Sequence, residues 1–110
     1  MVTKNDTSSQ LTTAMEYHQR GDLSAAAQAY RQVLNANPEH VDALHYLGVL
    51  YHQQSQNEQA LPLLEKAVSL APEDASYRSN LGLVYLALGD TTKAIESFHT
   101  ALQLQPGFGD

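Results

Sequence analysis

Five histidines are the side chains in this sequence best suited to holding a metal ion or moving a proton. His45 and His52 lie seven residues apart, which corresponds to about 10.5 Å of rise along a helix. Zinc–nitrogen bonds of about 2.0–2.1 Å do not bridge that separation. His18 and His52 lie 34 residues apart and could share an ion, but no nearby carboxylate completes a tetrahedral set. We therefore expect no metal and interpret His18, His45 and His52 as polar lining, and His40 and His99 as surface residues.

Other catalytic chemistry has little support. The chain has no cysteine, which excludes disulfides, thiolate catalysis and cysteine-ligated zinc. It also contains no Gly-x-Ser-x-Gly elbow, no His-Glu-x-x-His helix and no glycine-rich phosphate loop. Carboxylates such as Glu16 and Glu65 are scattered on polar faces. The sequence therefore predicts a protein that is not an enzyme and needs no cofactor.

Size, charge and hydropathy restrict the class of protein further. With 110 residues, 43% of them apolar and 16% charged, the chain fits one folded domain. Six basic residues against twelve acidic ones give a net charge of -6, which argues against binding nucleic acid or an anionic membrane. No apolar run approaches the roughly 20 residues of a membrane span, and the first residues do not resemble a signal peptide. We expect a cytoplasmic protein.

A unit of 34 residues recurs three times. Its positions are marked by aligned prolines, alanines, tyrosines and glycine–aspartate pairs: Pro38, Pro72 and Pro106; Ala26, Ala60 and Ala94; Tyr17, Tyr51 and Tyr85; Gly21-Asp22 and Gly89-Asp90. The copies run over about 7–40, 41–74 and 75–108, within one repeat domain at 8–108. Residues 1–7 are expected to form a flexible tail, and 109–110 to begin a truncated fourth copy.

Each copy contains two apolar stretches with helical spacing, separated by a polar breaker. In the middle copy, Leu44, Leu47 and Leu50 recur at intervals of three, and a second apolar face follows from Ala60. The pattern predicts an all-α protein with helices near 8–20, 24–36, 41–54, 58–70, 75–88 and 92–105. N-caps are expected at Asp22, Asn57, Asp74 and Asp90, each contributing ~1 kcal/mol.

Small residues recur where the two helices of a copy should approach closely. These are Ala14, Gly48 and Gly82, and the larger side chains of Tyr30, Leu64 and Phe98 are expected to fill the space beside them. Burying each larger side chain should contribute roughly 1.5–3 kcal/mol. Pro62 falls inside the predicted fourth helix, where it removes one backbone hydrogen bond and favours a slight bend.

The arrangement resembles the tetratricopeptide repeat family. The residues that carry the resemblance are Leu44, Leu47-Gly48, Tyr51, Ala60, Leu64, Ala67 and Pro72 in the second copy, and Leu81-Gly82, Tyr85, Gly89-Asp90, Ala94, Phe98, Ala101 and Pro106 in the third. The resemblance implies antiparallel helix pairs stacked in a right-handed superhelix, with a concave groove lined by the first helix of each pair. The repeats look most like those at the N-termini of longer bacterial proteins, including glycosyltransferase-like ones.

The resemblance also assigns the groove positions. They carry few charges and no lysine or arginine: Leu11, Met15 and His18 in the first copy; Asp42, His45, Tyr46, Val49, His52 and Gln53 in the second; Ser79, Asn80, Leu83 and Leu86 in the third. Met15, Val49 and Leu83 share one repeat position and are expected to form an apolar stripe across the groove.

Two known modes of peptide capture in this family find little match here. The carboxylate clamp needs lysine, arginine and asparagine at positions that hold Leu11, Met15, Tyr46, Ser76 and Asn80 in this chain. The asparagine ladder of O-GlcNAc transferase-type arrays is matched by Asn80, while Tyr46 and Thr12 occupy the other two rungs. The resemblance therefore implies a groove suited to an extended or helical segment with apolar side chains.

Three functions follow as hypotheses. The first is an interaction scaffold that binds a peptide segment of a protein partner in the groove. The second is a substrate-recruiting N-terminal module of a larger enzyme, such as a glycosyltransferase. The third is self-association through an uncapped face of the last helix, formed by Ile95, Phe98 and Leu102.

Overall fold

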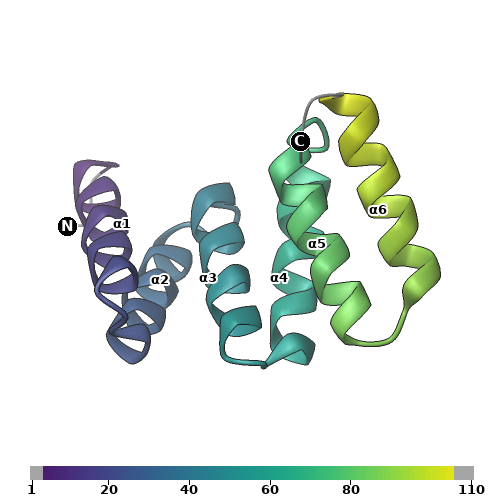
Figure 1. Cartoon of the computed structure of the whole chain (residues 1–110). Coiled ribbons are helices and arrows are strands. Elements are labelled where there is room, and N and C mark those ends of the chain that lie inside the picture. The colour runs from purple at the N-terminus through teal and green to yellow at the C-terminus, as the bar shows by residue number, and fades with distance from the viewer. Residues whose placement is uncertain (1–3, 106–110) are drawn as a thin grey trace.

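Helices make up almost all of the protein that the computed structural model describes, which is residues 4–105 (Figure 1). Their bounds are α1 Lys4–Gln19, α2 Leu23–Ala36, α3 Val41–Gln53, α4 Asn57–Leu70, α5 Ala75–Ala87 and α6 Thr91–Leu104. No strand occurs between residues 4 and 105, so the predicted all-α class is confirmed. The positions of Pro106 and of the expected fourth copy at 109–110 lie outside the described residues.

The helix ends follow local signals closely, with one exception. Five helices begin and end within two residues of the predicted bounds. The first helix instead begins at Lys4, so that residues 4–7 of the predicted flexible tail are helical. These four residues include neither proline nor glycine, and nothing in them stops a helix from extending toward the N-terminus. The rest of the predicted tail, residues 1–3, is outside the described part.

Aspartates cap three of the helices, as predicted. The side chains of Asp22, Asp74 and Asp90 accept hydrogen bonds from the backbone N–H groups of Ala25, Tyr77 and Lys93, at 3.4, 3.1 and 3.1 Å respectively. Each bond satisfies one of the free amides in the first turn of α2, α5 or α6. These caps fix where the second helices of the outer pairs, α2 and α6, and the first helix of the third pair, α5, begin.

The middle repeat is capped differently from the prediction. Asn57 is the first residue of α4 and not its cap, and Gln56 at the cap position makes no side-chain hydrogen bond there. At α3, the imidazole Nδ1 of His40 accepts from the backbone N–H of Ala43 at 3.3 Å. A neutral imidazole nitrogen is an acceptor like a carboxylate oxygen, so a histidine read from the sequence as a surface residue serves as an N-cap.

The turn between α3 and α4 carries backbone strain. Ser55 has a φ of 61°, where the equivalent residues of the other two copies are Gly21 at 81° and Gly89 at 86°. Glycine adopts this left-handed conformation freely, whereas a residue with a Cβ pays roughly 1–2 kcal/mol. The turn geometry is thus set by the repeat and is maintained even where the sequence lacks glycine.

Helices within a pair approach most closely at the small residues. A Cβ atom added to Gly48 would lie 2.7 Å from the Cγ atom of Leu64, and one added to Gly82 would lie 2.8 Å from Cε1 of Phe98. The ring of Phe98 is therefore half-buried against α5. This differs from the expectation that Phe98 forms part of the uncapped face of α6. Ile95 and Leu102 are exposed on α6, at 61% and 49%.

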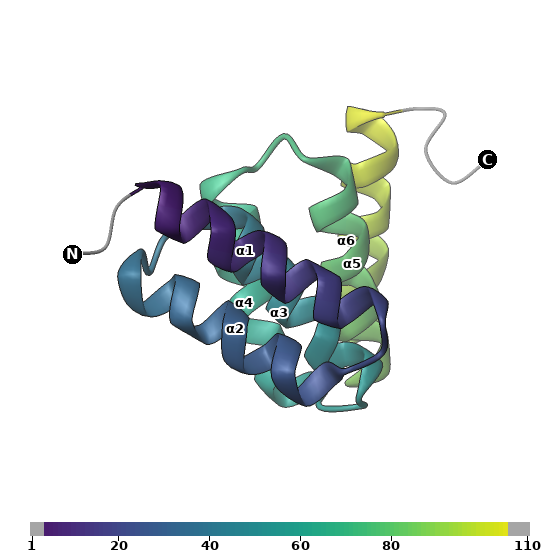
Figure 2. The same ribbon diagram turned by 90° about the vertical axis from the view of Figure 1, so that its left-hand side faces the viewer.

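Two hydrophobic clusters hold the stack together. The first joins α1, α2 and α3 and includes Tyr30, Leu47 and Leu50. The second joins α3, α4 and α5 and includes Leu44 and Leu64. Because α3 contributes to both clusters, the helix pairs form one continuous right-handed superhelix and not three separate hairpins. The described part measures 44 × 25 × 24 Å, and Figure 2 shows the stack from its α1 end.

We predict that Gly48→Ala destabilises the protein more than Gly82→Ala. The new methyl group at position 48 meets Cγ of the fully buried Leu64, whereas the ring that it meets at position 82 belongs to the half-buried Phe98, which can shift toward solvent. Overpacking of about 1–3 kcal/mol should exceed the roughly 1 kcal/mol gained by replacing a helical glycine. Urea unfolding of both variants measures the two losses, and an equal or larger loss for Gly82→Ala would contradict this packing.

Candidate functional site

The first helices of the three pairs carry the predicted groove residues, but not all of these side chains are accessible. Half-buried positions are Leu11, Met15, His18, Tyr46, Val49, His52, Ser79 and Asn80; exposed positions are Asp42, Gln53, Leu83 and Leu86. His45 is the exception, since only 8% of it is exposed. The set therefore divides into residues that can meet a ligand and one that cannot.

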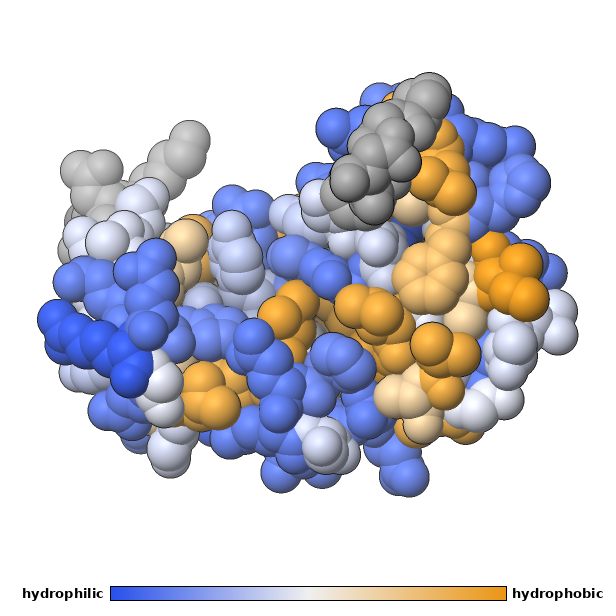
Figure 3. Space-filling view, in the orientation of Figure 1, coloured by the Kyte–Doolittle hydropathy of each residue, from blue (hydrophilic) through white to orange (hydrophobic). Residues whose placement is uncertain are grey.

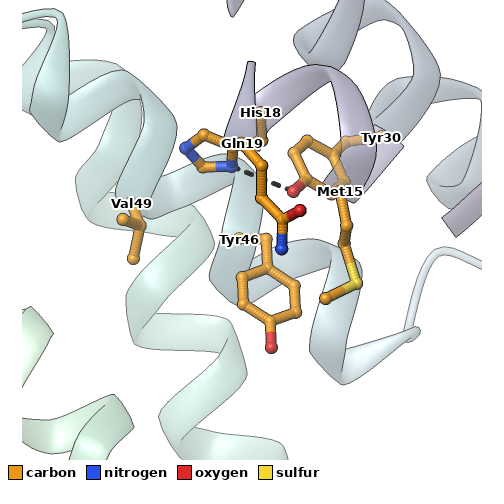
Figure 4. A pocket seen from close by; sticks show the side chains of 6 residues that line it. All are labelled: Met15, His18, Gln19, Tyr30, Tyr46 and Val49. Atoms are coloured by element: carbon orange, nitrogen blue, oxygen red, sulfur yellow. Dashed lines mark hydrogen bonds between the residues drawn. The ribbon is translucent and has the colours of Figure 1, made fainter. Parts of the chain in front are cut away.

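A pocket of about 250 Å³ lies between α1 and α3 (Figure 4). We call it the α1–α3 pocket, and its lining comprises Met15, His18, Gln19, Tyr30, Tyr46 and Val49. Met15 and Val49 face it from opposite sides, as Figure 4 shows, and its lining is mostly apolar. Four of the six residues, all except Gln19 and Tyr30, belong to the predicted groove set.

A chain of hydrogen bonds through His18, a lining residue of the α1–α3 pocket, links α1, α2 and α3. Oε1 of Gln53 only accepts, so the His18 ring donates from Nε2 at 2.7 Å and uses Nδ1 to accept from the Tyr30 hydroxyl at 3.0 Å. Burial of Tyr30, together with neighbouring Tyr46, raises the pKa of Tyr30 to about 12, so its hydroxyl stays protonated at neutral pH and donates. His18 is thereby held in one orientation between α1, α2 and α3.

The predicted apolar stripe is only partly assembled. Met15 and Val49 line the same pocket, whereas Leu83 is not among the residues that line it. Leu83 and Leu86 project from α5 and are 41% and 52% exposed. In Figure 3 apolar side chains gather at the centre and right of the view, where Figure 1 draws α3 to α6. An apolar surface therefore continues beyond the pocket toward the third pair.

His45 is buried between α3 and α5 and does not line an open groove, contrary to the expectation. Its ring stacks on Tyr77 with centroids 4.2 Å apart, and its Nε2 accepts from Nδ2 of Asn80 at 2.8 Å. The Tyr77 hydroxyl in turn donates to Asp42 Oδ1 at 2.9 Å. Three predicted groove residues thus hold successive repeats together, and Tyr77, which the sequence analysis did not select, covers His45.

The histidines do not come together as ligands. His18 bonds to Gln53 and Tyr30, while the ring of His52 turns toward α4 and donates from Nδ1 to Oδ1 of Asn57 at 2.5 Å. Among residues whose side chains are described, no three histidine, aspartate or glutamate side chains are grouped so as to hold a metal ion. His18 and His52 are therefore polar side chains that each hydrogen-bond to specific partners on neighbouring helices.

Polar bonds between repeats recur at two fixed spacings. His18–Gln53, Asp42–Tyr77 and His45–Asn80 are each 35 residues apart and join first helices. Two more are 20 residues apart and join a second helix to the next first helix. Arg31 donates to the Tyr51 hydroxyl at 2.8 Å, and the Tyr85 hydroxyl donates to Glu65 at 2.7 Å. None of these pairs was predicted from the sequence, although polar residues about one repeat length apart would have indicated the three pairs between first helices.

Burial and the adjacent carboxylate of Glu65 raise the pKa of Tyr85 to about 12. The hydroxyl therefore remains a donor to Glu65 over the physiological pH range.

No helix in the described part of the chain is both long and apolar enough to cross a membrane. The candidate site is a face of the stack together with the α1–α3 pocket.

Comparison with family models and curated proteins finds one family. A model described as "Tetratricopeptide repeat" matches residues 17–84, and a second of the same description matches residues 75–108. The protein described as "Protein CTR9 homolog" from Arabidopsis thaliana is 36% identical over 84 residues, covering 76% of this chain. The chain spans only 8% of that relative's length.

Solved structures give the same fold. A Thermobaculum terrenum O-GlcNAc transferase mutant is 37% identical with a TM-score of 0.90, and the match covers 98% of this chain and 21% of that one. The first repeat domain of Spaghetti, solved with the HSP90 peptide SRMEEVD, has a TM-score of 0.92 over 98% of this chain and 86% of its own. Its identity is 18%, so that likeness concerns the fold alone.

We predict that the protein loses stability as the pH falls below about 6.5, and that His45 is a cause. Burial lowers the pKa of His45 in the folded protein, against a smaller raising effect of Asp74 and Asp42. The unfolded chain then binds the proton more tightly than the folded one. The contribution is complete above pH 6.5 and is lost as the pH falls toward the lowered pKa.

Urea unfolding at pH 7.5 and pH 5 measures this effect. His45→Gln keeps a hydrogen-bonding side chain beside Asn80 but does not titrate, so its stability should change less between the two pH values than that of the unmodified protein. His99→Gln, at an exposed position of α6, is the matched control and should retain the full pH dependence. Equal pH dependence in the His45 variant and the control would contradict the assignment.

Proposed function

Because this chain belongs to the tetratricopeptide repeat family, we propose that it is a protein-interaction scaffold that binds an extended peptide segment of a partner along α1, α3 and α5. The observation that carries the proposal is the α1–α3 pocket, which is open, mostly apolar and lined by residues of both first helices. Few convergent polar groups around an apolar pocket are typical of a binding site. Family membership supports the class of function, and the pocket supports the place.

The pocket suits one apolar anchor side chain. Met15 and Val49 supply apolar walls, and the ring of Tyr46 stacks on Tyr30 at a centroid distance of 6.1 Å to form a flat third wall. About 250 Å³ accommodates one leucine, methionine or phenylalanine side chain. The amide of Gln19 is exposed beside the pocket and is available to a peptide backbone. Exposed Leu83 and Leu86 offer further apolar contact along the same segment.

Charge makes an acidic tail a poor occupant of this face. The groove positions carry no lysine or arginine, and Asp42 adds a carboxylate among them. The Spaghetti domain binds an HSP90 peptide, but the clamp positions here hold Leu11, Met15, Tyr46, Ser76 and Asn80. We therefore propose a neutral or basic segment with apolar side chains. Its affinity should lie near the micromolar scale, since an extended peptide loses its own conformational freedom on binding.

We predict that Val49→Glu weakens binding of such a peptide by at least about tenfold, since a carboxylate in the pocket must be desolvated without a partner. Suitable probes are 12-residue peptides selected from a displayed random library on the purified protein and then synthesised. Fluorescence anisotropy measures their affinity, and circular dichroism checks that helical content is retained. Unchanged affinity in a folded Val49→Glu protein would refute this placement of the groove.

Ile95→Glu is the matched control for this experiment. It introduces the same charge in place of an exposed apolar residue on α6, away from the α1–α3 pocket, and should leave the peptide affinity unchanged.

Self-association through Ile95 and Leu102 also stays a prediction. Sedimentation velocity of the unmodified protein and of Ile95→Glu tests it, because the substitution should dissociate any oligomer formed through this face.

A second candidate function is favoured by one comparison. The O-GlcNAc transferase structure is similar over 98% of this chain, which accounts for 21% of that longer chain. A repeat module of this kind in a longer enzyme would recruit the substrate to a catalytic domain elsewhere in the chain. Reading the gene beyond the codon for Asp110 tests this: a catalytic domain in frame supports it, and further repeats alone or a stop codon contradicts it.

A further inference from the structure

A second crevice lies between α2 and α4, with α3 as its floor. It has a volume of about 510 Å³, and we call it the α2–α4 crevice. Its apolar walls come from Leu34, Leu47, Pro62 and Leu63, and Arg31 and Tyr51 lie at one side. The side-chain amides of Asn35 and Gln59 complete the lining. The crevice is therefore mostly apolar with one positive charge.

The crevice and the α1–α3 pocket lie on opposite faces of α3. Leu47 lines the crevice and Val49 lines the pocket, and residues two apart in a helix point roughly 200° away from each other. No residue lines both. A ligand in one therefore leaves the other free, and the two sites can be tested separately.

Arg31 is held in place but its charge is not neutralised. Its Nε and Nη2 donate to the Tyr51 hydroxyl at 3.1 and 2.8 Å, and the guanidinium carbon lies 5.8 Å from the centre of the Tyr51 ring. Two of its five N–H donors are used in this way. Within the described side chains no carboxylate lies within ion-pair distance of Arg31, although the chain carries a net charge of -6. An oriented guanidinium beside apolar walls is well suited to a carboxylate.

The equivalent crevice one repeat later is polar, with the charged side chains of Arg78, Lys93 and Glu96 in its lining. It is lined by Leu81 and Tyr85, which match Leu47 and Tyr51, but Glu96 and Ser97 replace Pro62 and Leu63. The position of Arg31 is taken by Glu65, which accepts from the Tyr85 hydroxyl. The fold therefore does not require an apolar crevice at this place. Its composition is specific to the first two repeats.

The same comparison gives a reason for Pro62. The residue lies inside α4, which continues from Asn57 to Leu70, and proline there removes a backbone hydrogen bond and destabilises an ordinary helix interior. Its ring is exposed and forms part of the crevice wall. Compared with Glu96 at the equivalent position of the third copy, Pro62 gives the crevice a rigid apolar surface.

We propose that the α2–α4 crevice is a second docking site, for a protein segment that carries a carboxylate beside large apolar side chains. The carboxylate pairs with the free N–H groups of Arg31, and an apolar side chain lies between Leu34, Pro62 and Leu63. Its charge preference is opposite to the one proposed for the groove on the other face. One scaffold then holds two segments of different chemistry on opposite sides of α3.

The test uses two blocked peptides that differ in one residue, Ac-SGLELFGS-NH2 and Ac-SGLKLFGS-NH2. Titration of the 15N-labelled protein with each, followed by NMR, gives both the affinity and the site. We expect the glutamate peptide to bind about threefold to tenfold more tightly than the lysine peptide. The largest shifts should come from Arg31, Tyr51 and Leu63.

Charge reversal makes the test specific. Arg31→Glu should invert the ranking of the two peptides, and the milder Arg31→Gln should abolish the difference. Arg31 is exposed, and circular dichroism checks the fold of both variants. Lys93→Glu makes the same charge change in the neighbouring crevice and should leave the ranking unaltered. The proposal would be overturned by equal affinities of the two peptides, or by shifts confined to the α1–α3 pocket. It would also be overturned if the crevice signals shifted with protein concentration in the absence of peptide, because the occupant would then be a second copy of the chain.

Discussion

Each helix pair has more apolar surface than it can cover by itself, and the stack exists because neighbouring pairs cover one another. The middle pair shows this constraint most directly. Its first helix, α3, gives Leu47 and Leu50 to one hydrophobic cluster and Leu44 to the other. Both the α1–α3 pocket and the α2–α4 crevice are bounded by this helix. The sites are therefore positioned by the same contacts that hold the three pairs in one body, and a change that loosens α3 should affect both.

The period and the helix boundaries could be predicted because they depend on local signals. Aspartate caps act within a few residues of where they occur, and the structure follows them at α2, α5 and α6. Register then placed Met15 and Val49 correctly on one pocket, since equivalent positions of stacked first helices meet. The structure of the middle copy differs from the other two where its sequence differs: His40 caps α3, and Ser55 takes the left-handed turn position that glycine holds elsewhere.

Exposure of the groove residues could not be predicted in the same way, because it depends on side chains that are specific to one copy. His45 is buried because Tyr77 of the next repeat stacks on it, and the position of Tyr77 is held by Ala43 in the preceding copy. The helical position of Phe98 allowed both a place beside Gly82 and a place on the uncapped face of α6. The ring lies beside Gly82, because the missing Cβ of this glycine leaves room for it. Repeat register predicts which helix face a residue shares, whereas its neighbours in the next copy determine what remains accessible.

The tyrosines between repeats have a consequence for how the outer wall can vary. The Tyr51 hydroxyl accepts from a cation, Arg31, while the equivalent Tyr85 hydroxyl donates to an anion, Glu65. A phenol does both without any change of its own position. The contact between a second helix and the next first helix thus tolerates either sign of charge on the second helix. Evolution or design can therefore change the charge of the second helices without losing this contact between repeats.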